Sequence, residues 1–183
     1  MRVRSAVPGE SVVVEFEPIE AAIFTDTLGL VGSLIDSARH IDHLPELIGD
    51  PALARLLPAG YDGDDDAADE FRRFTRDELI EGKLEDSFQV LSAFERAGAW
   101  PTVPEDGMVL VRIEDARVQS WLRAITDARL TLDARIRQDR TTLAASLDDD
   151  DIEHYRNVME WLGFVQESLL VAVDPASADD LIR

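Results

Sequence analysis

The chain has 183 residues, of which 45% are hydrophobic, and a formal net charge of −20 from 38 acidic and 18 basic side chains. This length fits a single domain that buries about 70% of its unfolded surface. The charge disfavours direct binding to DNA or anionic membranes and favours a cationic protein partner, because polyanions repel an acidic surface. No cysteine is present, which excludes disulfides, thiolate nucleophiles and thiolate metal sites.

The N-terminal segment predicts a β-hairpin followed by a helix. Residues 2–6 and 12–16 flank a Pro8-Gly9-Glu10 turn, and Pro18 stands where a helix tolerates proline, at its first position. An apolar stripe at three- and four-residue steps then follows: Phe24, Leu28, Val31, Ile35 and Ala38. The segment lacks the apolar run of a signal peptide, and no stretch reaches the length of about 18 residues that spans a bilayer. We therefore expect a cytoplasmic protein.

The middle of the chain predicts further helices. Asp50 is a good N-cap with Pro51 after it, and Pro58 ends that short helix. The apolar phase of the next helix fails near Asp77, and Thr75 with Glu78 fits a capping box, so we expect a bent or new helix starting near Arg76. Its core-facing stripe should be Ile80, Leu84, Phe88, Leu91 and Phe94.

The C-terminal half predicts one strand and two helices. Residues 108–113, MVLVRI, form the strand, and Asp115 caps a long helix. The stripe of this helix is Val118, Trp121, Ile125, Ala128, Leu132 and Ile136. The last helix is apolar on more than one side, with Trp161, Leu162, Phe164, Val165, Leu169, Leu170 and Val171, which motivates a homodimer hypothesis.

The expected fold is mainly α with a small antiparallel β element, an α+β arrangement of about five helices around one core that includes Trp121, Trp161 and Phe88. We expect one domain over residues 1–183: a hairpin at 1–17, helices at 18–98, a strand at 108–113, helices at 115–173 and a loose tail at 174–183. Residues from Val12 and from Val109 share a strand–Glu–helix pattern in which Phe24 matches Trp121. Either a duplicated βα unit that pairs its strands or generic amphipathic similarity explains this.

One stretch carries a family resemblance. It contains DPALARLLP, then Tyr61 and an acidic loop, then EFRRFT and Lys83, and further along the chain WLRAITDARLTLDARI and WLGFVQESLL follow. This order resembles a bacterial family filed as domain of unknown function 2017, some members of which are labelled oxidative-stress transcriptional regulators. The resemblance covers most of the chain and implies a regulatory role.

The chain offers few residues for metal or enzyme chemistry. His40 and His43 with Asp36 and Asp42 could approach a metal, but such spacing at a helix end also suits the helix dipole. The acidic runs at 64–66 and 148–151 lack the spacing of a calcium loop and precede predicted helices, where negative charge is favourable. No nucleotide-binding, esterase or zinc-protease motif occurs. We therefore expect no metal, no cofactor and no enzymatic activity.

Two groups of arginines are candidates for binding residues. Arg72, Arg73 and Arg76, with Lys83, lie in the family-like stretch, where they either pair with neighbouring carboxylates or bind a partner. We take these four as the candidate partner-binding residues. The arginines between 117 and 140 spread around the polar side of the long helix and alternate with aspartates, which favours a solvated face over DNA readout.

We expect a non-enzymatic regulator of the oxidative-stress type that acts through a protein partner, possibly the transcription machinery, rather than by binding DNA. The alternative is a protein-binding adaptor module without a transcriptional role, and a hydrolytic or metal-dependent enzyme comes third. A regulator of this type would most naturally sense oxidants with a pair of cysteines, so a thiol switch is excluded here. Oxidation of Met108 or Met159 is a weak substitute.

Overall fold

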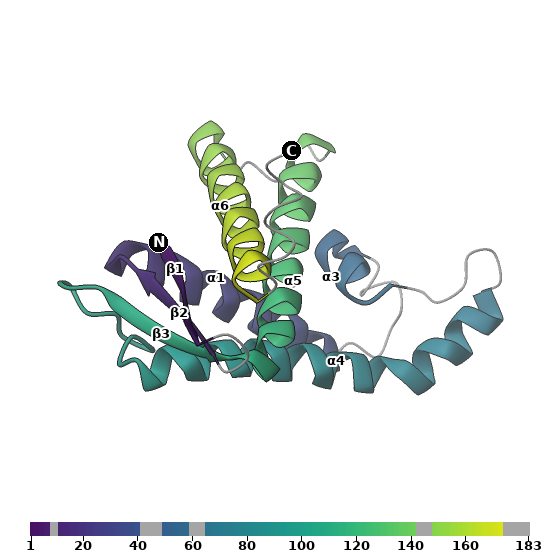
Figure 1. Ribbon diagram of the computed structural model, residues 1–183. Helices are drawn as coiled ribbons and strands as arrows, with labels where there is room; N and C mark the ends of the chain where they lie inside the picture. Colours follow the sequence, from purple (N-terminus) through teal and green to yellow (C-terminus); the bar gives the residue numbers. More distant parts are fainter. Residues whose placement is uncertain (8–10, 41–48, 59–64, 142–147, 174–183) are drawn as a thin grey trace, which may run out of the picture.

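In the computed structural model, three antiparallel strands and a set of helices surround one core (Figure 1). The structure describes residues 1–7, 11–40, 49–58, 65–141 and 148–173. The predicted α+β class is therefore confirmed, with five α-helices in the described part of the chain. The expected loose tail at 174–183 and most of the acidic loop lie outside the described residues.

The sheet has the order β1-β2-β3. Strands β1 (Arg2–Val7) and β2 (Ser11–Phe16) form the predicted hairpin, and β3 (Val109–Glu114) pairs antiparallel with β2, with Val12 opposite Ile113. Burial alternates along β3, so one face of the sheet packs on the helices. Thus the two strands that share the strand–helix pattern do lie side by side.

Helix α1 (Pro18–Ser37) begins at Pro18 and buries its predicted stripe, and the short turn η1 (Ala38–His40) extends it. Helix α1 is also long and apolar enough to cross a membrane, so the expectation that no segment reaches that length was wrong. One helix of this kind is weak evidence for a membrane span, because a core helix of a soluble protein can be equally long and apolar. Here the stripe of α1 packs inside the structure.

Helix α3 (Pro51–Leu56) is capped as its sequence predicts. The Asp50 carboxylate accepts hydrogen bonds from the backbone N–H groups of Ala52 and Leu53, at 2.8 and 3.2 Å. Helix α3 packs on α5, where Arg135 donates to Asp50 at 2.8 Å. A local cap and a long-range ion pair therefore share one carboxylate.

Helix α4 (Asp65–Arg96) is continuous, so the predicted break near Arg76 was wrong. No proline or glycine interrupts residues 65–81, and the charged residues at 77 and 78 are exposed. The apolar phase fails there because this part of α4 extends past the body of the protein (Figure 1). The apolar periodicity is therefore lost where α4 stops packing against the rest of the protein, whereas the helix itself continues.

The core-facing side of α4 also differs from the predicted stripe at one residue. Phe88 is 62% exposed, whereas Ile80 and Phe94 are buried. Ser87, two turns from each of them, takes the inward position, and Phe88 lies about 100° further around the helix. Phe88 is therefore not a core residue, and Phe94 fills that role.

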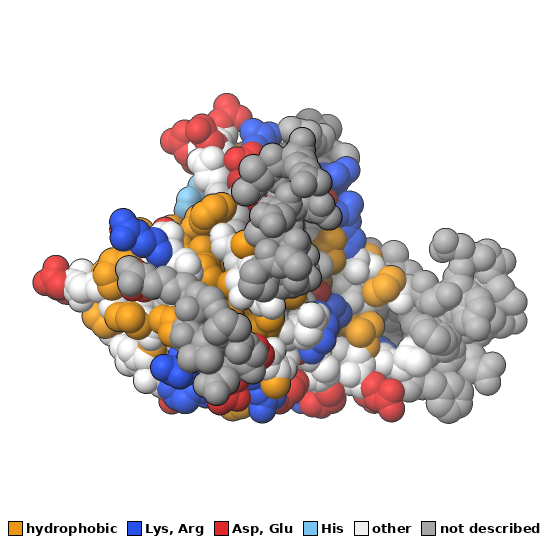
Figure 2. Space-filling model, viewed as in Figure 1, with side chains coloured by type: hydrophobic (Ala, Val, Ile, Leu, Met, Phe, Trp, Pro, Cys, Tyr) orange, Lys and Arg blue, Asp and Glu red, His pale blue; other side chains and the backbone are white. Residues whose placement is uncertain are grey.

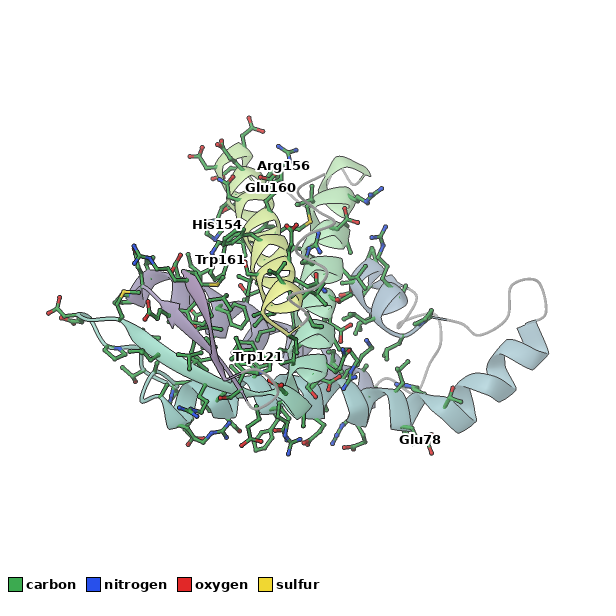
Figure 3. The ribbon with its side chains drawn as sticks, in the orientation of Figure 1. Glu78, Trp121, His154, Arg156, Glu160 and Trp161 are labelled. Carbon is green, nitrogen blue, oxygen red and sulfur yellow. The ribbon has the colours of Figure 1, made fainter. Side chains whose placement is uncertain are left out.

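Helices α5 (Asp115–Thr141) and α6 (Asp149–Val173) stand upright on α4 as an adjacent pair (Figure 1). The stripe predicted for α5 is buried throughout. Trp121 stacks on Phe24 and Phe94, with ring centroids 5.7 and 5.9 Å apart, and Trp161 meets Phe24 edge to face. Figure 3 labels Trp121 at the base of α5 and Trp161 on the sheet side of α6. The aromatic core thus joins the sheet to α1, α4, α5 and α6.

Candidate functional site: the α4–α5 surface

All four candidate partner-binding residues lie on α4. Arg72, Arg76 and Lys83 share one side of the helix by their spacing, and Arg73 lies about 100° away. The side chains of Arg72 and Arg73 are outside the described part of the structure. The role of the four residues in binding a partner stays a prediction.

The structure shows what Arg76 and Lys83 contact within the protein. The Arg76 guanidinium donates to the backbone carbonyl of Ala38, where α1 ends. The Lys83 ammonium lies 2.6 Å from the Asp127 carboxylate of α5. Both side chains therefore fasten α4 to its neighbours, and a partner would meet them only at their exposed edges.

The ion pair of Lys83 and Asp127 is largely shielded from solvent, with side-chain exposures of 18% and 6%. Burial raises the pKa of the Asp127 carboxyl above its ordinary value, and the hydrogen bond from Lys83 offsets this only in part. A buried carboxylate of this kind depends on its cation. The Lys83 charge therefore stabilises the Asp127 carboxylate inside the protein.

A second ion pair lies one turn further along α4. Arg123 grips the Asp86 carboxylate with two hydrogen bonds, Nε to Oδ2 at 2.6 Å and Nη2 to Oδ1 at 2.7 Å. Asp86 is nearly buried, whereas 59% of the Arg123 side chain is exposed. Two parallel hydrogen bonds between a guanidinium group and a carboxylate fix the orientation of the two side chains and also pair their charges. The two pairs together are neutral and set the register between α4 and α5.

A groove of about 510 Å³ runs beside these ion pairs. Its apolar lining comes from Leu79 of α4 and from Leu122 and Leu130 of α5, and Leu79 is 38% exposed. The neighbouring acidic residues Asp77 and Glu78 face solvent, and Figure 3 shows Glu78 pointing away from the body. An apolar groove bordered by carboxylates suits a protein segment with apolar and basic side chains.

The arginines of α5 are engaged mostly with protein groups. Arg135 and Arg137 pair with Asp50 and Asp133, and Arg129 donates to Gln166 of α6 at 2.9 Å. On the face in Figure 2, Lys and Arg side chains are separated by acidic and apolar ones. Among the described side chains on this face, the basic ones form several separate groups.

Several residues outside the α4–α5 surface bear on the other hypotheses. Phe164 and Leu170 of α6 are 55% and 50% exposed, which leaves the homodimer hypothesis open for test. Met108 is 46% exposed and Met159 is partly buried. Within the described ranges, no three His, Asp or Glu side chains gather as a metal site would require. His43 lies outside those ranges.

A second cavity was missed by sequence reasoning. About 380 Å³ lies between α1, α5 and α6, with Leu30, Leu34, His154 and Tyr155 in its lining. Leu30 is 73% exposed and lies outside the buried stripe of α1. An apolar residue out of phase with its stripe was the available signal, and such residues are common on protein surfaces.

The protein is mainly helical with a small sheet, and its sequence has no recognisable catalytic motif, so its class is defined by the fold alone. Comparison with known proteins identifies the family. Residues 1–173 match the family described as domain of unknown function (DUF2017), and the chain belongs to it.

Among similar proteins, the putative oxidative stress regulator AosR of Mycobacterium leprae is 26% identical over 85% of this chain and 79% of its own length. The oxidative stress regulators AosR of Mycobacterium bovis and Mycobacterium tuberculosis show the same identity and the same coverage of both chains. No solved structure matches.

Proposed function

We propose that this protein is a cytoplasmic, non-enzymatic regulator of the oxidative-stress response that acts by binding another protein instead of DNA. The relatives named oxidative stress regulator support the biological role. The net charge of −20 supports the route, and it is the observation that carries the proposal. A surface with this charge repels the phosphate backbone and attracts basic proteins.

The partner would dock on the outer side of α4 and on the groove it forms with α5. Exposed Asp77 and Glu78 supply the negative charge, and Leu79 supplies an exposed apolar contact in the same turn. The candidate residues Arg72, Arg73, Arg76 and Lys83 belong to the same helix, so they would lie within or beside this interface. A cationic surface, for example on a component of the transcription machinery, fits this chemistry.

The stress signal would reach this protein without a thiol switch. With no cysteine in the chain, neither a disulfide nor a sulfenic acid can form here. The partner, or the amount of the complex, would therefore carry the response to oxidants.

The test is recovery of the partner from cell extract with the tagged full chain, followed by mass spectrometry. We expect a basic protein connected with transcription, and we expect the double variant Asp77→Lys/Glu78→Lys to lose it. The matched control Asp150→Lys/Glu153→Lys reverses two exposed carboxylates on α6 and should retain it.

Two results would contradict the proposal. Sequence-preferring binding of the pure protein to duplex DNA at physiological salt would overturn the indirect route. Recovery of a partner unconnected with transcription would support the adaptor alternative in place of the regulator.

A further inference from the structure

Three arginines line one pocket at the edge of the sheet. The pocket, of about 460 Å³, lies between β3 and the C-terminal part of α4, and its lining includes Arg96, Arg112 and Arg117. Arg96 is the last residue of α4, Arg112 lies on β3, and Arg117 lies in the first turns of α5. Figure 1 shows β3 running along this part of α4. Three separate elements therefore direct basic residues to one concave site.

These arginines differ from several others in the described structure, which neutralise carboxylates within the protein. Arg55, Arg123, Arg135 and Arg137 each form an ion pair within the protein. In the part of the chain that the structure describes, none of the three pocket arginines forms such a pair. Among the described residues, their one side-chain hydrogen bond joins Arg112 Nη1 to Ser11 Oγ at a long 3.4 Å.

The charge of the pocket is opposite to that of the molecule. Glu114 is the single carboxylate in its lining, so three guanidinium groups face one negative charge. In a chain with 38 acidic and 18 basic residues, three arginines around one cavity without ion pairs mark a local positive potential. Guanidinium groups bind phosphate and carboxylate oxygens with two parallel hydrogen bonds.

The walls of the pocket restrict the size of its occupant. Ala93, Ala97 and Trp121 form an apolar floor, and the volume is within the range of pockets that hold small molecules. Strand β3 is an edge of the described sheet, so part of its backbone N–H groups face away from β2 and can donate to a ligand.

We propose that this pocket binds a small, multiply charged oxyanion, with Arg96, Arg112 and Arg117 as its ligands and Trp121 as part of its floor. The shared chemistry is a small molecule whose phosphate or carboxylate groups together carry at least two negative charges. The proposal is independent of the protein-partner function, because it concerns a different surface from the outer side of α4 near Glu78.

Isothermal titration calorimetry of the full chain against pyrophosphate and against citrate tests the site and distinguishes phosphate from carboxylate. We expect saturable binding of one anion per chain by at least one probe. Arg112→Gln and Arg117→Gln should each weaken that binding about tenfold, since each removes a charge-assisted contact. Arg156→Gln, which removes an equal charge from the upper part of α6 (Figure 3), should leave it unchanged.

Circular dichroism is used to check that each variant folds, and the two single variants serve as independent tests. Failure of both probes to bind would overturn the proposal. So would equal weakening by Arg156→Gln, because the effect would then come from net charge alone. Displacement of the bound anion by short duplex DNA would assign the arginines to nucleic acid and would also overturn it.

Discussion

The ion pair of Lys83 with Asp127 connects two helices in a place where water screens charge poorly. Removal of one partner from such a pair leaves the other charged and desolvated, which costs more than the pair itself contributes. Asp127 is the more buried of the two, and burial already raises its pKa. Replacement of Lys83 should therefore lower the stability of the folded protein more than replacement of Asp127.

We expect Lys83→Met to lower the free energy of unfolding by about 3 kcal/mol at neutral pH, because the Asp127 carboxylate then stays buried without its cation. The double variant Lys83→Met/Asp127→Leu should recover much of this loss. Urea denaturation followed by circular dichroism measures both. Equal losses in the single and double variants would show that Lys83 acts through packing instead of charge.

The same variant should depend on pH in a defined direction. A carboxyl group whose pKa is higher in the folded state contributes stability that is fully present below its unfolded pKa of 3.8 and lost as the pH rises through the folded value. Loss of Lys83 raises the folded pKa further. The deficit of Lys83→Met relative to the natural protein should therefore shrink as the solution becomes mildly acidic.

The opposite direction holds at Asp50. Partial burial pushes its pKa upward, but the hydrogen bonds from Arg135 and from the Leu53 and Ala52 backbone outweigh burial, so the pKa lies below its ordinary value. The stability from this cap is present above pH 3.8 and is lost as the pH falls through the lowered pKa. Two aspartates in one protein thus respond to acid in opposite ways.

At the scale of elements, the placement of α4 decides which phenylalanine belongs to the core. Phe94 is fully buried against Phe16, Phe24 and Trp121, and Phe88 is 62% exposed. Both residues are helical phenylalanines of the same size, so they form a matched pair for mutation.

Phe94→Ala should lower the free energy of unfolding by about 3 to 5 kcal/mol, because it leaves a cavity in the aromatic core. Phe88→Ala should cost less than about 1 kcal/mol, as is usual at exposed positions. Thermal unfolding followed by circular dichroism compares the two. A larger loss from Phe88→Ala would mean that α4 turns its other side to the core, or that Phe88 is covered by a second molecule.

The elements that could be predicted from sequence are those whose signals are local. Pro18 and Pro51 at helix starts, the Asp50 cap and the β-branched run at 12–14 depend on neighbouring residues alone, and the structure has them as expected. The continuity of α4 could not be predicted in this way. The continuity of α4 depends on where the rest of the protein stops covering the helix. A helix that becomes exposed to solvent and a helix that breaks both lose the regular spacing of apolar residues in the sequence.

The site residues show the same division. Lys83 could be singled out by the family-like stretch, but its contact with Asp127 joins positions 44 residues apart and needs the packing of α4 on α5. The pocket arginines at 96, 112 and 117 come from a helix end, a strand and a helix start. Nothing in their spacing indicates a common site, because the sheet edge that gathers them exists only after β3 has paired with β2.

For the whole molecule, self-association is the open question that α6 raises. Phe164 is 55% exposed, and Val171, seven residues further on, lies on the same side of the helix and is only partly covered. Glu160 and Glu167 border this stripe. An apolar stripe beside charged residues resembles an interface between helices, which has an apolar centre and a polar rim.

We expect the protein to form a homodimer through this stripe, and Phe164→Glu to convert it into a monomer because a carboxylate would then be buried at the centre of the interface. Light scattering coupled to size-exclusion chromatography at tens of micromolar measures the mass directly. Phe88→Glu, at a similarly exposed phenylalanine on α4, controls for the general effect of added charge. A mass of 20.4 kDa for the natural protein would rule the dimer out. A dimer that survives Phe164→Glu but dissociates with Phe88→Glu would place the interface on α4, where it would compete with the proposed partner.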